Sequence, residues 1–207
     1  MARPRTHDID SLLDAAERLL AEHGPSGVTI RGLAAETGAS SGSLYHAFGS
    51  RADLLGRMWL RAAKLYLALQ DEAIQRELSD DEGHEGAVRA TVAVASVPAV
   101  IQERSPATAT VLLRYPREEV LGPGLGPELR AELESLDGEL LAVLGRLAAA
   151  LWDRHDRASI ETVAICVVDL PTAILINRRE RIIDPLAALE AAVRGILTAG
   201  VEDSRPA

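Results

Sequence analysis

The sequence predicts an all-α protein, and three observations support this fold class. The 207 residues are 47% hydrophobic but only 3% aromatic, so the core must consist of many aliphatic side chains, as in packed helices. Apolar residues recur at three- and four-residue spacing along the chain, which is the period of an amphipathic helix. No strand-like alternation and no internal repeat stands out. The length allows a small domain joined to a larger one.

Two helices are predicted at the start of the chain. The first begins at Ile9 and ends before Pro25, because proline cannot continue a helix. Thr29 then precedes a short apolar segment, and its hydroxyl can cap the free amides of a second helix. This helix ends near Thr37, where Gly38 can adopt the left-handed backbone conformation that a tight turn requires.

A third short helix follows after a turn of only three residues. Ser40 can cap this helix over residues 41–48, in which Leu44 and Phe48 lie at i and i+4 on one face. Two short helices with so tight a joint must cross steeply. The sequence therefore predicts a helix-turn-helix.

The rest of the chain is also expected to be helical. Residues 50–53 have the pattern of a capping box that opens a long helix. The acidic, glycine-containing stretch 79–86 is expected to form a loop. Further helices are predicted over residues 87–104, 107–115, 127–154, 157–182 and 185–199.

Residues 28–55, VTIRGLAAETGASSGSLYHAFGSRADLL, closely resemble the DNA-binding signature of the TetR/AcrR family. The resemblance implies an N-terminal three-helix, helix-turn-helix DNA-binding domain over residues 1–50. It implies a C-terminal helical ligand-binding and dimerisation domain over residues 51–207. Such a protein is expected to be a homodimer without a cofactor, and the absence of a secretory signal and of an uninterrupted apolar stretch predicts a cytoplasmic location. It binds a pseudo-palindromic double-stranded DNA operator, usually as a repressor, and a small, largely apolar effector releases it.

The predicted recognition helix must expose small or polar side chains to enter the major groove. The expected DNA-contacting residues lie in this helix and at the starts of its two neighbours: Thr29, Arg31, Ser40, Ser41, Gly42, Ser43, Tyr45, His46 and Arg51. The chain departs from the usual family pattern at Ala47, where a histidine, tyrosine or basic residue is common. The arm Arg3-Pro4-Arg5 can compensate by entering the minor groove, or it can be a solubilising tail.

The charge and the apolar segments restrict the class of protein further. The net charge of −9 excludes a protein that coats nucleic acid over its whole surface, although a regulator needs only one basic face. The first ten residues have no apolar core of the kind found in secretory signals. Asp169 and Pro171 interrupt the longest apolar stretch, so no membrane span is expected.

Cys166, the single cysteine, cannot form an intrachain disulfide, and a buried structural thiol is favoured over a redox sensor.

The family resemblance implies that the last two long helices pair with those of a second subunit. Seven apolar residues can supply this interface, although burial inside one subunit is the alternative for about half of them: Val163, Val167, Ile174, Leu186, Leu189, Val193 and Ile196. The effector-binding candidates are Trp59, Arg114, Tyr115 and Asp169. Asp169 would need a partner if it were buried, but it can equally face water or a subunit interface.

Two other functions compete with this interpretation. A small helical enzyme is disfavoured because the chain has no nucleophile elbow, zinc-binding helix motif, phosphate loop or dinucleotide fingerprint. No catalytic residue and no metal site are therefore predicted. The other alternative keeps DNA binding but makes the C-terminal half a closed dimerisation core or a binding site for another protein.

Overall fold

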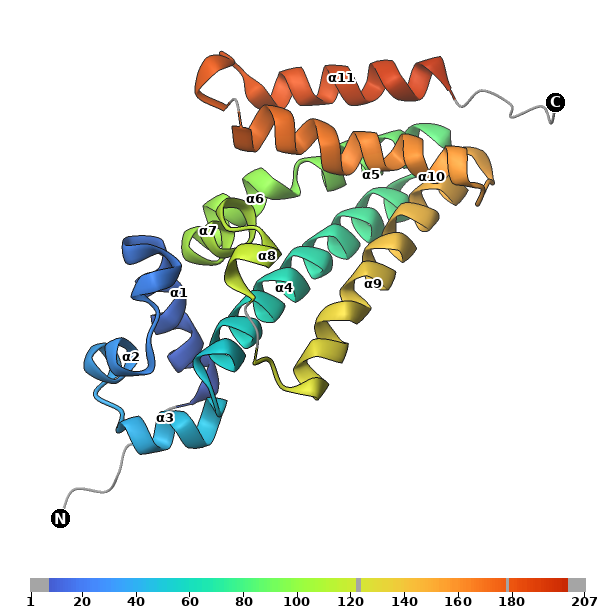
Figure 1. The fold of residues 1–207 in the computed structure, drawn as a ribbon. Helices are drawn as coiled ribbons and strands as arrows, with labels where there is room; N and C mark the ends of the chain where they lie inside the picture. Colours follow the sequence, from blue (N-terminus) through green and yellow to red (C-terminus); the bar gives the residue numbers. More distant parts are fainter. Residues whose placement is uncertain (1–7, 122–123, 178, 201–207) are drawn as a thin grey trace. The chain divides into compact units, whose positions relative to one another are not determined.

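The computed structural model describes residues 8–121, 124–177 and 179–200, and every regular element in these ranges is a helix (Figure 1). The predicted all-α fold is confirmed. The chain divides into two compact units by its internal contacts. Unit 1 comprises residues 1–64 and 102–136, and unit 2 comprises residues 65–101 and 137–207. Whether the functional boundary lies near residue 50 stays a prediction.

Unit 1 combines the N-terminal helices with a segment that is distant in sequence. Its elements are α1 (Ile9–Gly27), α2 (Ile30–Thr37), α3 (Ser41–Phe48), the start of α4 (Arg51–Asp80), the end of α6 (Val97–Arg104), α7 (Pro106–Arg114), α8 (Arg117–Val120) and the start of α9 (Pro127–Trp152). Within α1 the backbone leaves helical geometry at Gly24 (φ 70°, ψ −177°), just before Pro25. This break lies where the sequence predicted that the first helix would end.

The core of unit 1 is aliphatic and joins α1 to α7. Its fully buried side chains include Leu20, Val28, Leu33, Leu44, Leu54, Met58 and Val111. Val111 lies on α7, and α1 and α7 pack directly against each other. At the start of α4, Gly56 lies so close to Leu125 and Leu129 that an added Cβ would meet their methyl groups at 2.6 and 2.8 Å. The first turns of α4 are thus in close contact with the segment that leads into α9.

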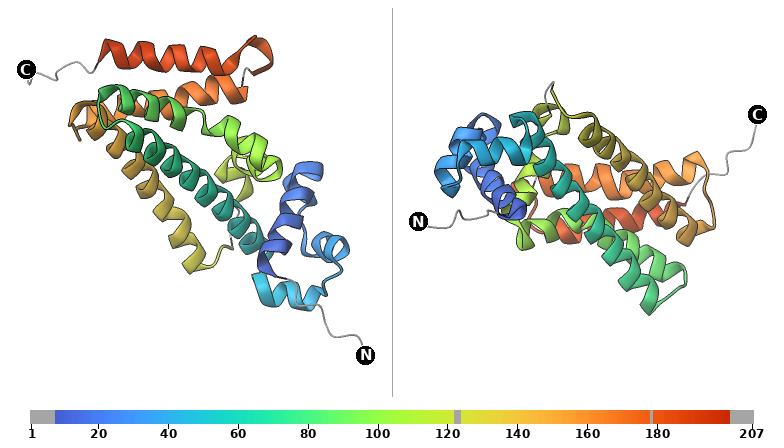
Figure 2. Two further views of the ribbon diagram at one scale, coloured as in Figure 1. Left: turned by 180° about the vertical axis from the view of Figure 1, so that it is seen from behind. Right: turned by 90° about the horizontal axis from the view of Figure 1, so that it is seen from below.

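Unit 2 contains the rest of α4 and α9 together with the C-terminal helices. The further elements are α5 (His84–Ala95), α10 (Arg157–Ala164), the π-helical segments η1 (Ile165–Asp169) and η2 (Thr172–Asn177), the 3₁₀ turn η3 (Arg179–Arg181) and α11 (Pro185–Ala199). Helix α11 runs alongside the α10–η2 segment (Figures 1 and 2).

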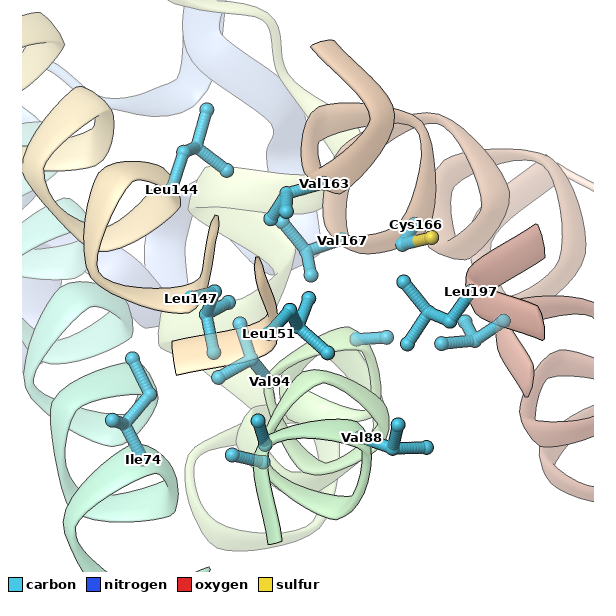
Figure 3. Close-up of a cluster of buried hydrophobic side chains, with 14 of the residues drawn as sticks. Ile74, Val88, Val94, Leu144, Leu147, Leu151, Val163, Cys166, Val167 and Leu197 are labelled. Atoms are coloured by element: carbon cyan, nitrogen blue, oxygen red, sulfur yellow. The ribbon is translucent and has the colours of Figure 1, made fainter. Parts of the chain in front are cut away.

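Aliphatic side chains from all the longer helices of unit 2 meet in one core, including Ile74 of α4 (Figure 3). Leu144, Leu147 and Leu151 of α9, Val88 and Val94 of α5, Val163 and Val167 of α10 and η1, and Leu197 of α11 all belong to this core, and Leu151 lies beside Val94 in its middle. Cys166 lies in this core with no exposed surface, as the sequence suggested. Burial raises the pKa of its thiol to about 11, so the thiol stays protonated near neutral pH.

Three predicted elements differ from the structure. The expected helix over 87–104 is divided into α5 and α6 at Ser96. The expected loop over 79–86 is shorter, because the backbone N–H of Gly83 donates to Asp81 Oδ1 at 2.8 Å and α5 begins at the next residue. The expected continuous helix over 157–182 changes to π-helix on both sides of Pro171. Proline has no N–H for the helical hydrogen bond and its ring crowds the preceding turn, which a wider helix accommodates.

One segment, Arg157–Asn177, is long and apolar enough to cross a membrane by length and composition alone. Helices in the core of a soluble protein meet the same criteria. Val163 and Val167 of this segment lie in the aliphatic core of unit 2 (Figure 3). The segment therefore gives only weak support for a membrane location.

We expect Gly38→Ala to destabilise the protein by about 1–2 kcal/mol, because φ is +72° at this position and side chains disfavour the left-handed region. Gly138→Ala is the matched control. Gly138 lies inside α9 with open space around an added Cβ, so alanine should stabilise by about 0.5–1 kcal/mol. Urea denaturation of the two variants measures both effects. Equal changes would contradict the assigned turn.

Candidate nucleic-acid interface

Helix α3 has one buried and one exposed face. Leu44 and Phe48 are 0% and 3% exposed and pack into the core of unit 1. Tyr45 is 56% exposed, and His46 is also exposed. Residues 41–43 are exposed as well, and they carry only small side chains. The outer face of α3 is therefore small and polar near its start and aromatic near its end.

Caps at three positions hold α2 and α3 at the angle of a helix-turn-helix. Thr29 Oγ1 accepts a hydrogen bond from the Gly32 N–H at 2.9 Å, and Ser40 Oγ accepts one from the Ser43 N–H at 3.0 Å. Between the helices, Gly38 has φ 72° and its N–H donates to the Ala34 carbonyl. These local interactions are the ones that the sequence pattern predicted.

The hydroxyl groups of α3 differ in what they can offer to a ligand. Ser40 Oγ donates to Ser43 Oγ at 3.1 Å, and Ser43 Oγ donates to the Ser40 carbonyl at 2.8 Å. Ser41 has no such internal hydrogen bond among the described residues. Of the three serines, Ser41 therefore has the hydroxyl with the most freedom to donate to DNA, and Gly42 beside it allows close approach of the backbone.

The two predicted arginine contacts occupy different environments. Arg51 donates from Nε to the Val28 carbonyl at 2.6 Å and from Nη2 to the Pro25 carbonyl. It thus ties the start of α4 to the turn between α1 and α2. Arg31 on α2 is exposed and has no hydrogen bond or ion pair among the described residues. Arg31 is the freer of the two for a phosphate contact.

Two further sequence predictions concern the edges of this surface. Ala47 is half-buried and packs against the core of unit 1, so its methyl group faces inward. The arm Arg3-Pro4-Arg5 lies outside the described residues.

A buried carboxylate connects three helices of unit 1. Glu17 of α1 is 2% exposed, and its Oε1 accepts from Arg61 Nη2 at 2.7 Å and from Arg61 Nε at 3.1 Å. Its Oε2 accepts from Thr108 Oγ1 of α7 at 2.6 Å. Arg61 also pairs with Asp14 Oδ1 at 2.7 Å. Burial works to lower the pKa of Arg61, but the hydrogen bonds and charges of Glu17 and Asp14 outweigh it and raise that pKa.

The surface of unit 1 described above has the architecture of a DNA-binding helix-turn-helix, and comparison with known proteins agrees. Residues 12–58 match the sequence profile of the family described as bacterial regulatory proteins, tetR family. The transcriptional repressor AcnR of Corynebacterium glutamicum is 35% identical over 78 residues, which are 38% of this chain. Residues 12–58 therefore form a DNA-binding domain of the TetR type. The match covers 37% of the AcnR chain, so the chain spans just over a third of the length of this curated relative.

Solved structures resemble this chain over nearly its whole length. FadR of Bacillus subtilis, solved with stearoyl-CoA, has a TM-score of 0.66 at 17% identity and covers 94% of this chain and 100% of its own. SmeT of Stenotrophomonas maltophilia, the repressor of a multidrug efflux pump, has a TM-score of 0.66 at 16% identity, with 98% and 94% covered. At these identities the likeness shows the fold alone.

The effector candidates are divided between the two units. Trp59 and Tyr115 both pack against the core of unit 1, and the guanidinium of Arg117 lies 5.9 Å from the Trp59 ring centroid, a cation–π distance. Arg114 is exposed. Asp169 belongs to unit 2 and is also exposed, so it needs no buried partner.

A shallow groove of about 240 Å³ lies on the α8–α9 side of unit 1. Both charged and aliphatic side chains line it: Arg117, Glu118, Leu121, Leu125, Arg130, Leu133 and Glu134. Its volume is below the usual range of small-molecule pockets. Among the described residues, no group of three or more metal-ligating side chains is gathered.

The C-terminal apolar residues separate into core and surface. Val163, Val167, Leu189 and Val193 are buried inside unit 2, whereas Leu186 is 46% exposed. Ile174 and Ile196 are partly buried against the same core. The sequence did not single out four further apolar residues of unit 2 that are exposed: Leu141, Ile165, Val168 and Ile183, of which Ile165 and Val168 are 42% and 38% exposed.

Sequence reasoning also missed two buried polar residues. Glu17 lies four residues after Leu13 and three before Leu20, on the apolar face of α1. Gln70 lies four residues after Tyr66 on the apolar stripe of α4. In both cases the helical period predicts an apolar residue at that position. A polar residue there could therefore have been identified as a buried polar side chain.

We expect Glu17→Ala to destabilise the protein by about 2 kcal/mol or more, because it leaves Arg61 and Thr108 without their shared acceptor. Asp14→Ala is the control. It removes an exposed partner of the same arginine and should cost less than about 1 kcal/mol. Urea denaturation of both variants gives the comparison. Similar losses would show that the buried carboxylate is no more important than the exposed one.

Proposed function

We propose that this chain is a transcriptional repressor that binds a pseudo-palindromic operator as a homodimer and leaves it when a small, largely apolar effector binds. The observation that carries the proposal is the exposed outer face of α3, supported from behind by Leu44 and Phe48. A transcriptional repressor, AcnR, is among the relatives that share part of this sequence. TetR proteins are regulators, and the proposal assigns no catalytic activity.

The chemistry of α3 suits a close approach to bases and phosphates. Ser41 and Gly42 are small enough to let the helix enter the major groove. Tyr45 and His46 are exposed and can donate to phosphate oxygens, which would fix the register of the helix. The N-terminus of α2, with Thr29 and Arg31, provides further backbone contacts. Helix α3 contains no lysine or arginine, so Arg31 supplies much of the positive charge nearby.

The partner subunit in the proposal is a second copy of this chain. Ile165 and Val168 of the η1 segment and Leu186 of α11 are large apolar side chains left exposed on unit 2. Burial of such side chains against identical ones is favourable, and twofold symmetry makes one patch serve both subunits. Two copies of α3 would then meet two half-sites of one operator.

Effector release follows from differential affinity. A ligand that binds more tightly to the conformation unsuited to the operator shifts the population away from DNA. A structural neighbour, FadR, was solved with stearoyl-CoA, and the long apolar acyl chain of that ligand supports an aliphatic part in the ligand of this chain. A cytoplasmic location follows if the operator is chromosomal.

Selection of duplexes from a randomised DNA pool by the purified protein tests the proposal. An enriched inverted repeat, bound with an affinity that falls steeply with salt, is the expected result. The slope should be roughly 0.9 log units per log unit of salt for each phosphate neutralised. Failure to enrich any repeated half-site, or an affinity independent of salt, would refute DNA recognition by this chain.

Tyr45→Ala should weaken binding to the selected duplex by about 1–3 kcal/mol while the melting temperature stays unchanged, because the side chain is exposed and contributes nothing to the core. Leu44→Ala is the contrasting variant on the same helix. It should destabilise the fold by about 2–5 kcal/mol. Fluorescence anisotropy and thermal melting of both variants distinguish the roles. Loss of stability in Tyr45→Ala would make Tyr45 structural.

Ile165→Glu should convert the dimer to monomers, because the twofold axis would bury two like charges close to each other in the interface. Unit 2 should stay folded, because the side chain of Ile165 is 42% exposed in the single subunit. Leu141→Glu is the control at another exposed apolar residue, 53% exposed on α9. Light scattering after size-exclusion chromatography measures the mass. Dimers in both variants, or monomers in both, would contradict the proposed interface.

A further inference from the structure

Gln70 is the exception among the buried polar side chains of unit 2. It lies on α4 and is 1% exposed, yet its Oε1 has no hydrogen-bond partner. The other two fully buried polar side chains described in this unit are satisfied locally. Thr91 donates to the Ala87 carbonyl at 2.9 Å, and Ser159 donates to the Asp156 carbonyl at 2.8 Å.

An unpaired acceptor in a protein interior costs free energy, and native structures seldom keep one without a use. Leucine or methionine would occupy a similar volume at this position without the cost. The amide of Gln70 does not act as a cap or a turn element either, because Gln70 lies inside the 30-residue helix α4. The amide is thus available to a group that is absent from the folded chain itself.

Tyr66 provides a second polar group one turn away on the same helix. Residues four apart lie on one helical face, so its ring and the Gln70 amide are neighbours along α4. The described residues offer the Tyr66 hydroxyl no hydrogen bond. Burial raises the pKa of this phenol well above its ordinary value, so the hydroxyl remains a neutral donor at physiological pH.

The surroundings of Gln70 restrict the chemistry of a ligand. The following turn of α4 carries Ala73 and Ile74, both buried in the aliphatic core of unit 2. Within the described part of this unit, no aspartate, glutamate, lysine or arginine is fully buried. An ionised ligand group beside Gln70 would lose its hydration without gaining a counter-charge. A neutral amide or hydroxyl would pay a far smaller desolvation penalty.

We propose that Gln70 is the polar anchor of the effector site and accepts a hydrogen bond from an N–H or O–H group of a neutral, otherwise aliphatic ligand. Tyr66 donates to the acceptor atom of the same polar group. Primary amides and alcohols with an aliphatic chain have this chemistry, whereas carboxylates and ammonium compounds do not. The inference rests on the proposed function only in identifying this ligand as the effector.

The test uses full-length protein and three defined probes with equal chains: decanamide, 1-decanol and decanoate. Affinity is measured by isothermal titration calorimetry below the critical micelle concentration of each probe. The variants are Gln70→Leu and, as a second apolar replacement, Gln70→Met. Gln75→Leu is the matched control, because Gln75 lies on the same helix but is exposed and donates to Asp71.

Wild type and Gln75→Leu should bind decanamide or 1-decanol more tightly than decanoate. Gln70→Leu and Gln70→Met should bind the neutral probes about five- to a hundredfold more weakly, because the ligand donor then lacks its acceptor. Without ligand, both Gln70 variants should melt at or above the wild-type temperature. Unchanged affinity in these variants, no binding of either neutral probe, tighter binding of decanoate, or a melting temperature several degrees lower would each overturn the proposal.

Binding to the selected DNA duplex separates this inference from the proposed function. Gln70→Leu should bind the duplex as wild type does, but decanamide should no longer release it. If wild type binds the neutral probes through Gln70 and never binds a selected duplex, the ligand site stands and the operator function falls. If wild type binds the duplex and the probes neither bind nor release it, the ligand site alone falls.

Discussion

The outer face of α3 depends on the burial of two side chains on its inner face. The helix has eight residues, and an isolated helix of this length is not stable in water. Leu44 and Phe48 supply the missing stability by packing into the core of unit 1. Because the tertiary structure holds the helix, its exposed positions can carry glycine, serine and other weak helix formers. The same residues allow a close approach to a DNA groove.

The buried Glu17 extends this dependence beyond the matched family segment. Its carboxylate holds Arg61 of α4 and Thr108 of α7, so α1 is bonded to a helix that lies almost a hundred residues later. Val111 of α7 completes the apolar core from the same side. The N-terminal three helices therefore form a compact unit together with α7 rather than alone. Any movement of α7 would alter the environment of a buried charge, which is energetically expensive.

The candidate site was predictable where its geometry is local. The caps Thr29 and Ser40 and the left-handed Gly38 follow from residue type and spacing within a few positions. The hydrogen-bond partner of each donor could not be predicted from the sequence in the same way. Arg51 looks like a phosphate contact in the sequence, but its guanidinium binds two carbonyls more than twenty residues earlier in the chain. Such a contact depends on how α4 begins relative to the preceding turn.

The sequence by itself determined the all-α fold, the limits of the helix-turn-helix and the family, because helical period, caps and turn residues act over a few neighbouring positions. Only the tertiary structure decided which side chains face inward. Val163 and Val167 are core while Ile165 and Val168 are surface, and Gln70 is buried beside aliphatic neighbours. Burial depends on contacts between helices that are far apart in sequence. The apolar period of one helix does not show which of its apolar residues another helix will cover.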